Sequence, residues 1–297
     1  FEETTSRSYP NKTLASTVIG FVGADNQGSM GIERSWNSFL SGTAGKSVSL
    51  KDASQSEIAN SNKSYIAAEN GYDLTLTIDS NIQSIVEKYL SEAVEEYKCE
   101  SGITIAMNPT NGKILAMADY PSFDCNDKNT PNSHLAQIWD SLSSEDKNKE
   151  LYKMWTPKAI TDTYEPGSVF KIITSSIALE EKFADTSSVV YNCTGSITVP
   201  GESRPIKCFK YPNSHGAQSL TNALENSCNP VFVELGIKIG KNITYKYYEA
   251  YGFFGKTGIS ISGEPSSGIF YDINKINDHE LGTMSFGQRF TITPLQM

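Results

Sequence analysis

The sequence predicts an α+β fold: an antiparallel sheet with a helical subdomain, preceded by a small, loop-rich domain that contains β-structure. A strongly amphipathic helical stretch and a hairpin occupy residues 72–121, and a mainly helical block follows them. The first 70 or so residues are instead rich in Ser, Asn, Gly and Thr, with short apolar islands. We therefore expect an N-terminal domain at 1–71 and a larger domain at 72–297.

Composition narrows the class of protein. At 297 residues, with 38% apolar and 20% charged residues, the chain is globular rather than disordered. Its net charge of −9 and pI of about 5.0 argue against a nucleic-acid partner, which usually requires a basic surface. No segment approaches the roughly 18 consecutive apolar residues of a membrane helix, and no signal peptide is present. Because the first residue is Phe, we expect the chain to be a piece of a longer protein.

The elements of the larger domain can be predicted in order. In "YDLTLTIDS" the residues Leu74, Leu76 and Ile78 alternate with polar ones, which predicts a strand after a linker or exposed hairpin at 51–71. Asp79 or Ser80 can cap an amphipathic helix over 82–97. The stretch "GITIAMNPTNGKILAMADYP" predicts a hairpin turning across 108–112, where an Asn-Gly pair supplies positive φ angles. Helices are expected at 168–181, near 217–226 and near 230–240.

The stretch "TYEPGSVFKIITSSIALEE" is the first candidate for chemistry. A helix that starts at Pro166 and Gly167 would place Ser168 and Lys171 side by side, because residues three apart share a face. A lysine can take a proton from a serine only if burial lowers its pKa. The apolar neighbours Val169, Phe170, Ile172 and Ile173 would supply that burial. A chance S-x-x-K at a surface helix is the alternative, and the wholly apolar continuation argues against it.

A second polar corner lies between two predicted helices. Ser227, Cys228 and Asn229 stand just before Pro230 in "LENSCNPVF". The serine and the asparagine, two residues apart, can face one cavity while Cys228 turns into the core. S-x-x-K together with S-x-N is a known pairing in serine acyl-transfer enzymes.

Many segments carry one resemblance, among them "YPNKTLASTVIGFVG", "GIERSWNSFLSG", "MNPTNGKILAMADYPSFD", "YEPGSVFKI", "NSCNPVF" and "SFGQRFTITPLQM". Over nearly its whole length the chain resembles a class B penicillin-binding protein of the Gram-positive type, a peptidoglycan D,D-transpeptidase. The resemblance implies a pedestal (dimerisation-type) domain, then a domain of the serine β-lactamase type. By position, Ser168 would be the acylated nucleophile, Lys171 its base and Ser227 a proton relay. Asn229 would bind the substrate amide, and the Ser168 N–H would form half of the oxyanion hole.

The resemblance also implies partners and a location. Peptidoglycan stem peptides would be the substrates and β-lactams would acylate the same serine, with no cofactor required for catalysis. A glycosyltransferase and other cell-wall synthesis proteins would be partners in elongation, division or sporulation. The site of action would be the extracytoplasmic face of the bacterial membrane, with the anchor helix absent from this chain. A D,D-carboxypeptidase, a class D-like β-lactamase, and a non-catalytic β-lactam sensor or scaffold are the alternatives.

The family's third motif, K-[ST]-G, requires care. Lys256-Thr257-Gly258 fits the pattern but lies only about thirty residues after Ser227, in "YGFFGKTGISISGE". The resemblance places the catalytic motif after a segment like "TPLQM", where this chain stops. We therefore expect Lys256-Thr257-Gly258 to be a decoy. Arg289 is a further departure, because the family often has Gly there.

Cys193, Cys208 and His215 form a last cluster within 23 residues. We expect a hairpin with one cysteine on each arm. Two thiolates and an imidazole could provide three ligands of a tetrahedral structural zinc, with Cys228 or Asp185 as the fourth. A cross-strand disulfide and plain unligated thiols are the alternatives.

Overall fold

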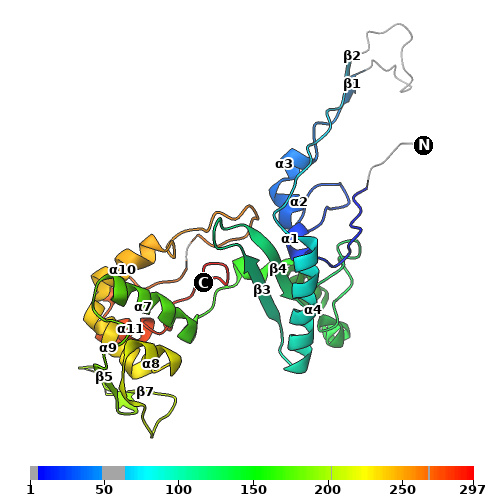
Figure 1. Cartoon of the computed structure of the whole chain (residues 1–297). Helices are drawn as coiled ribbons and strands as arrows, with labels where there is room; N and C mark the ends of the chain where they lie inside the picture. The colour runs from blue at the N-terminus through cyan, green and yellow to red at the C-terminus, as the bar shows by residue number, and fades with distance from the viewer. Residues whose placement is uncertain (1–5, 49–63, 202, 267) are drawn as a thin grey trace, which may run out of the picture. The chain divides into compact units, whose positions relative to one another are not determined.

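The computed structural model describes residues 6–48, 64–201, 203–266 and 268–297, which form two compact units (Figure 1). The first unit holds the described residues up to Ala159 together with Ser260–Gly263. The second unit holds Ile160–Ile259 and Glu264–Met297. Among the helices described, none is long and apolar enough to cross a membrane.

The N-terminal part of the first unit is built from short elements. They are α1 (Ser16–Ile19), α2 (Gly31–Ser35), α3 (Asn37–Leu40), β1 (Lys46–Val48) and β2 (Ser64–Ile66). Strands β1 and β2 pair antiparallel, with Lys46 opposite Ile66. This agrees with the small, loop-rich domain predicted from composition. Of the predicted linker at 51–71, residues 51–63 lie outside the described part.

The predicted helix and hairpin are confirmed as α4 (Ser80–Glu96), β3 (Gly102–Met107) and β4 (Ile114–Tyr120). Asp79 caps α4 by accepting the N–H groups of Asn81 and Ile82. The buried side chain of Gln83 fixes the helix to the hairpin. Its Oε1 accepts the Met117 N–H, and its Nε2 donates to the Met117 carbonyl oxygen. Helix α4 therefore packs along both strands (Figure 1).

The strand expected in "YDLTLTIDS" is wrong, because this segment has no partner strand among the described residues. Its alternation does control burial: Leu74, Leu76 and Ile78 are half-buried and their neighbours are exposed. One backbone bond, from the Asp79 N–H to the Leu115 carbonyl, connects it to β4. Alternation of apolar and polar residues thus indicates a half-buried extended segment, but it does not show that the segment pairs with another strand.

The polar region 122–155 contains helical structure that the sequence pattern did not indicate. It holds η1 (Leu135–Gln137), η2 (Trp139–Ser141) and α5 (Ser144–Trp155), and α6 (Lys158–Thr161) follows. Ser143 caps α5 by accepting the Asp146 N–H. Only Leu151 and Met154 of α5 are buried, which is too few for a visible helical period.

The second unit is built around the apolar helix α9 (Asn229–Ile239). Its other helical elements are η3 (Gly167–Phe170), α7 (Lys171–Glu180), α8 (Leu220–Glu225), α10 (Lys241–Ala250), η4 (Ile273–Lys275) and α11 (Asp278–Met284). Helices α7, α10 and α11 all pack on α9 (Figure 1). The three helices predicted here are confirmed, although the first begins with the tight 3₁₀ turn η3. Helices α10 and α11 were not predicted.

Two small antiparallel sheets lie beside α9. Strand β5 (Tyr191–Cys193) pairs with β8 (Gly216–Gln218), and β6 (Ser196–Ile197) pairs with β7 (Ile206–Lys207). The hairpin expected between the two cysteines is present as β6 and β7, but both cysteines lie just outside its paired strands. Cys193 lies opposite Gly216, and Cys208 directly follows β7. A strand carrying two or three residues shows too short an alternation for its partner to be read from sequence.

Candidate active site

The turn that carries Ser168 depends on a glycine conformation. Gly167 has φ +62°, and a Cβ there would meet no atom within 4 Å, so the backbone angle rather than space requires glycine. Pro166 then leads into η3, whose three-residue period brings Ser168 and Lys171 to the same side. The Nζ atom of Lys171 lies 3.1 Å from the Ser168 Oγ.

The second corner is held by a left-handed residue. Ser227 has φ +47°, a strained angle for a residue with a side chain. Backbone bonds from Ser227 N–H to the Leu224 carbonyl and from Cys228 N–H to the Ala223 carbonyl hold the turn in place. This turn ends α8 and starts α9, so both neighbours of Cys228 are free to point toward Lys171.

Lys171 Nζ is the point at which the predicted residues meet. It donates to the Ser227 Oγ and carbonyl oxygen at 2.9 Å each and to the Asn229 Oδ1 at 2.7 Å. The Ser227 hydroxyl in turn donates to the Ser168 Oγ at 2.9 Å. The structure thus brings together Ser168, Lys171, Ser227 and Asn229 from two segments that lie more than fifty residues apart in sequence.

Burial lowers the pKa of Lys171 to about 8. The amine is fully buried, and the rings of Phe232 and Phe286 lie with their centres 5.4 and 5.9 Å from Nζ. The sequence assigned part of this burial to Val169 and Ile172, which is wrong, since these side chains are 52% and 59% exposed. The aromatic rings that cover the lysine amine belong to Phe232 of α9 and to Phe286, which follows α11.

This arrangement can activate a serine. A lysine with a pKa near 8 is partly neutral at neutral pH, and its lone pair can accept the Ser168 proton over the 3.1 Å contact. Ser227 bridges the same two groups, so a proton can pass between the lysine and a leaving group without moving either side chain far. Nucleophilic acyl transfer is therefore the chemistry that these residues support.

The segment Lys256-Thr257-Gly258 has its own local contacts. Its Thr257 N–H donates to the buried carboxylate of Glu264 at 2.7 Å, and the Gln296 amide donates to the Gly255 carbonyl at 3.0 Å. No hydrogen bond described for this segment reaches Ser168 or Lys171. That it is a decoy stays a prediction.

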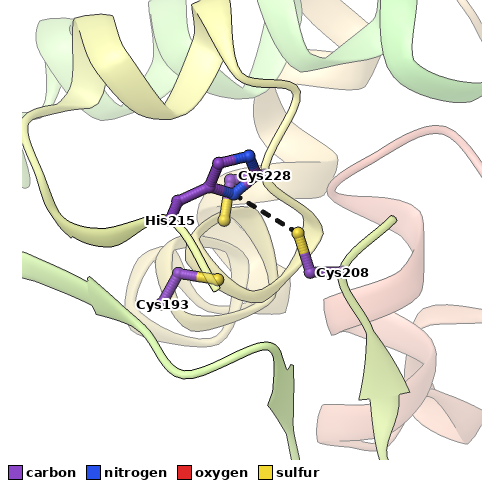
Figure 2. Close-up of side chains that lie close together, drawn as sticks. All are labelled: Cys193, Cys208, His215 and Cys228. Carbon is purple, nitrogen blue, oxygen red and sulfur yellow. Dashed lines mark hydrogen bonds between the residues drawn. The ribbon is translucent and has the colours of Figure 1, made fainter. Parts of the chain in front are cut away.

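A group of potential metal ligands lies directly behind the second corner. The ligand atoms of Cys193, Cys208, His215 and Cys228 all lie within 4.8 Å of one another. Figure 2 shows the three sulfur atoms and the imidazole converging, with the His215 Nδ1 3.4 Å from the Cys208 Sγ. All five cysteines of the chain are free thiols. The fourth member of the group is thus Cys228.

Asp185, the other residue considered as a fourth ligand, lies outside the group. Its carboxylate accepts bonds from the side chain of Ser187 and from the backbone N–H groups of Ser187 and Ser188. Hydrogen bonding, chiefly from Ser188, lowers its pKa to about 2. The aspartate therefore organises its own loop.

The surroundings of Cys193 and His215 favour the protonation states that bind a metal, whereas burial of Cys228 favours its neutral thiol. Burial would raise the pKa of Cys193, but bonds from the backbone N–H groups of His215 and Gly195 help to lower it overall. Burial also lowers the pKa of His215, which keeps the imidazole neutral. Burial raises the pKa of the Cys228 thiol, and Cys228 would have to lose its thiol proton to bind a metal. Backbone N–H groups directed at sulfur are a common outer shell of thiolate metal sites.

Comparison with known proteins gives the family. A model described as the penicillin binding protein transpeptidase domain matches residues 102–297, and one described as the penicillin-binding protein dimerisation domain matches residues 1–76. The chain belongs to the penicillin-binding protein transpeptidase family. The transpeptidase match contains Ser168, Lys171, Ser227 and Asn229 and all members of the cysteine cluster.

Similar proteins support this assignment over the whole chain. Stage V sporulation protein D of Bacillus subtilis is 36% identical over 99% of this chain and 42% of its own length. A peptidoglycan D,D-transpeptidase FtsI of Buchnera aphidicola is 33% identical over 99% of this chain and 47% of its own. A peptidoglycan synthetase structure from Bifidobacterium adolescentis matches with TM-score 0.78 and 28% identity, over 97% of this chain and 48% of that one. The chain thus spans about half the length of these relatives, and the predicted α+β penicillin-binding fold is confirmed.

Sequence reasoning missed several residues around the Ser168–Lys171 pair. Phe232 and Phe286 bury the lysine, and the Lys207 carbonyl accepts the Asn229 side-chain amide at 3.4 Å. No local motif marks these residues, because each reaches the site only through tertiary packing. The one available signal was the apolar run "PVFVEL" directly after the S-x-N corner, which predicts a buried helix beside it.

Proposed function

We propose that this chain forms part of a peptidoglycan D,D-transpeptidase that makes an acyl-enzyme on Ser168. The observation that carries the proposal is the buried Lys171 amine, which lies within 3.1 Å of the nucleophile and contacts both polar residues of the S-x-N corner. A lysine with a lowered pKa beside a serine is one arrangement that activates a serine nucleophile.

The reaction follows from these contacts. Neutral Lys171 accepts the Ser168 proton while Oγ attacks the carbonyl of the D-Ala-D-Ala bond, and the Ser168 N–H stabilises the developing oxyanion. The C–N bond then breaks, and D-Ala leaves with a proton returned through Ser227. An amine of a neighbouring stem peptide attacks the ester and forms the cross-linking C–N bond; the C–O bond to Ser168 breaks, and the amine's proton passes through Lys171 to the Ser168 Oγ. Asn229 would hold the amide of the donor peptide.

Labelling with a fluorescent penicillin tests the proposal on the complete protein. We expect one stable label per molecule, and none after Ser168→Ala. Incubation with stem peptides should yield cross-linked product. Fast β-lactam turnover would instead indicate a β-lactamase, and D-Ala release without cross-links a carboxypeptidase. Stable labelling without action on any peptide would indicate a sensor.

The setting of this activity is part of the same proposal. Peptidoglycan stem peptides are the substrates and β-lactams the inhibitors. The partners are a glycosyltransferase and other cell-wall synthesis proteins at the extracytoplasmic face of the membrane. We place the pedestal domain at 1–71 and the transpeptidase domain from 72 onward; the dimerisation-domain match at 1–76 supports a boundary in this region.

We also propose that Cys193, Cys208, His215 and Cys228 bind a structural Zn²⁺. Three sulfurs and one imidazole are a donor set typical of closed, tetrahedral zinc sites. Zinc–sulfur bonds of about 2.3 Å imply sulfur–sulfur distances of about 3.8 Å, so atoms within 4.8 Å need only small movements to close the site. The presence of the imidazole among the sulfurs favours a metal over a disulfide.

Metal analysis of the purified protein tests this second proposal. We expect about one zinc per molecule, and loss of the metal after Cys193→Ser or Cys208→Ser. Cys125→Ser is the matched control, because Cys125 is also a buried thiol but lies in the first unit. Substoichiometric zinc in protein purified without chelators would contradict the proposal.

A further inference from the structure

Residues 285–292 contact the turn at 164–168, which carries the proposed nucleophile Ser168. We name residues 285–292 the clasp. The clasp is hydrogen-bonded to the turn and to the helix that follows it. These bonds join Tyr164 and Ile292 in both directions (3.0 and 3.1 Å), the Arg289 N–H to the Glu165 Oε1 (2.8 Å), the Gly167 N–H to the Gly287 carbonyl (2.8 Å) and the Thr174 Oγ1 to the Ser285 carbonyl (2.7 Å). These contacts lie on both sides of Ser168 along the chain.

The clasp touches the turn backbone to backbone at one point. Gly287 has φ +80°, and a Cβ built there would overlap the carbonyl oxygen of Gly167. The Gly167 N–H therefore has its partner on the clasp and not within the turn, so the peptide plane one residue before Ser168 is fixed by a segment about 120 residues away in sequence. Ser168 is the second residue of η3, and N–H groups in the first turn of a helix have no partner within that helix, so the Ser168 N–H can reach a substrate carbonyl.

The Glu165 carboxylate supplies the contact beside this point. It accepts the backbone N–H of Arg289, two residues along from Gly287, and a charged acceptor makes such a bond stronger than a neutral one. Arg289 itself has φ +64°, an unfavourable angle for an arginine. Its guanidinium lies 3.6 Å from the Glu280 carboxylate, but both groups are partly exposed, and such surface pairs contribute little. Glu165 is also exposed, but its bond ends on the Arg289 backbone and joins the clasp to the turn of Ser168, whereas the Glu280 pair joins the Arg289 side chain to α11.

We propose that Glu165 is a positioning residue for the nucleophile: through the Arg289 N–H it keeps the clasp against Gly167, and the clasp fixes the direction of the Ser168 Oγ and N–H. This inference rests on the proposed role of Ser168 as the acylated residue. A turn freed from the clasp would present Oγ to Lys171, and the N–H to the substrate, in a smaller fraction of the time. Misplacement by about 1 Å is enough to cost on the order of 100-fold in rate.

Glu165→Ala tests the proposal in the complete protein. We expect the first-order acylation rate constant with a fluorescent penicillin to fall about 10- to 100-fold while the dissociation constant of the non-covalent complex changes little. Hydrogen exchange, read on peptides covering 163–171, should become faster in the same variant. Exchange does not depend on activity, so it tests the clasp even if the wild-type protein fails to acylate and the proposed function is wrong.

Two variants serve as controls. Glu165→Gln keeps an acceptor oxygen and should retain the rate within about threefold. Arg289→Gly keeps the N–H and the left-handed backbone but removes the guanidinium, so it should behave like wild type if the backbone contact matters. Unchanged exchange and an unchanged rate constant in Glu165→Ala would overturn the proposal. So would a loss of labelling that comes only from a smaller folded fraction, with the rate constant of the remainder unaltered.

Discussion

The environment of Lys171 is the strongest indication that this residue acts as a general base. Burial between two aromatic rings lowers its pKa to about 8, and only the neutral amine can accept the serine proton. Because the base is the deprotonated form, the acylation rate constant should rise about tenfold per pH unit below pH 8 and level off above it. Stopped-flow acylation between pH 6 and 10 measures this. A flat profile would contradict the assigned base.

Replacing the base separates charge from proton transfer. Lys171→Arg keeps a positive charge beside Ser227 and Asn229, but an arginine is not deprotonated in proteins. We expect the acylation rate constant to fall by about 100- to 10,000-fold, the range that a general base contributes. The pH dependence near 8 should disappear with it. An arginine variant that acylates at the wild-type rate would show that the lysine acts only through its charge.

At the residue scale, the sequence predicted the polar members of the site and missed the apolar ones. Ser168 and Lys171 lie on one turn, and Ser227 and Asn229 on another, so local spacing was sufficient to propose each pair. Burial of the lysine depends on which distant rings pack over it. Of its neighbours in sequence, Phe170 is buried as expected, whereas Val169 and Ile172 lie on the exposed side of η3 and α7.

Helices α9 and α11 approach each other through small residues. A Cβ at Gly236 of α9 would lie 2.6 Å from the Ser285 Cβ, an atom that moves only with its backbone. Overpacking of this kind costs about 1–3 kcal/mol, and the better helix propensity of alanine returns at most about 1 kcal/mol. Gly236→Ala should therefore lower the free energy of unfolding by about 1–2 kcal/mol in urea denaturation. Glu234→Ala, on the exposed face of the same helix, should change it little; equal effects would contradict close packing.

Element prediction succeeded where a segment is long and its pattern is complete. Helix α4 and the hairpin that follows it show their full periodicity in sequence, and the structure contains both. The strands around the cysteine cluster have two or three residues each, so their own sequence pattern is too short to determine the pairing, which depends on tertiary packing. For the same reason Cys228 could be named as a ligand only as one of two choices. The fold of a distant loop decides which side chain completes the group.

On the scale of the whole molecule, the S-x-N corner and the cysteine cluster share one stretch of chain. Cys228 lies between Ser227 and Asn229, and Lys207, whose carbonyl accepts the Asn229 amide, precedes Cys208. Both belong to the second unit, and the cluster joins β5, the end of β7, the loop before β8 and the start of α9. A metal bound there would cross-link four segments that the small sheets hold only weakly.

Removal of the metal should therefore affect one unit and leave the other unchanged. Binding at a thousandfold excess over the dissociation constant stabilises a protein by about 4 kcal/mol, and a chelator removes that contribution. We expect faster hydrogen exchange in peptides covering 191–232, with no change in α4, β3 and β4 of the first unit. Cys125→Ser should show the same chelator response as wild type, and Cys193→Ser should show the metal-free pattern without chelator. Equal exchange with and without chelator, or a uniform change across both units, would contradict a zinc site that organises this corner of the transpeptidase domain.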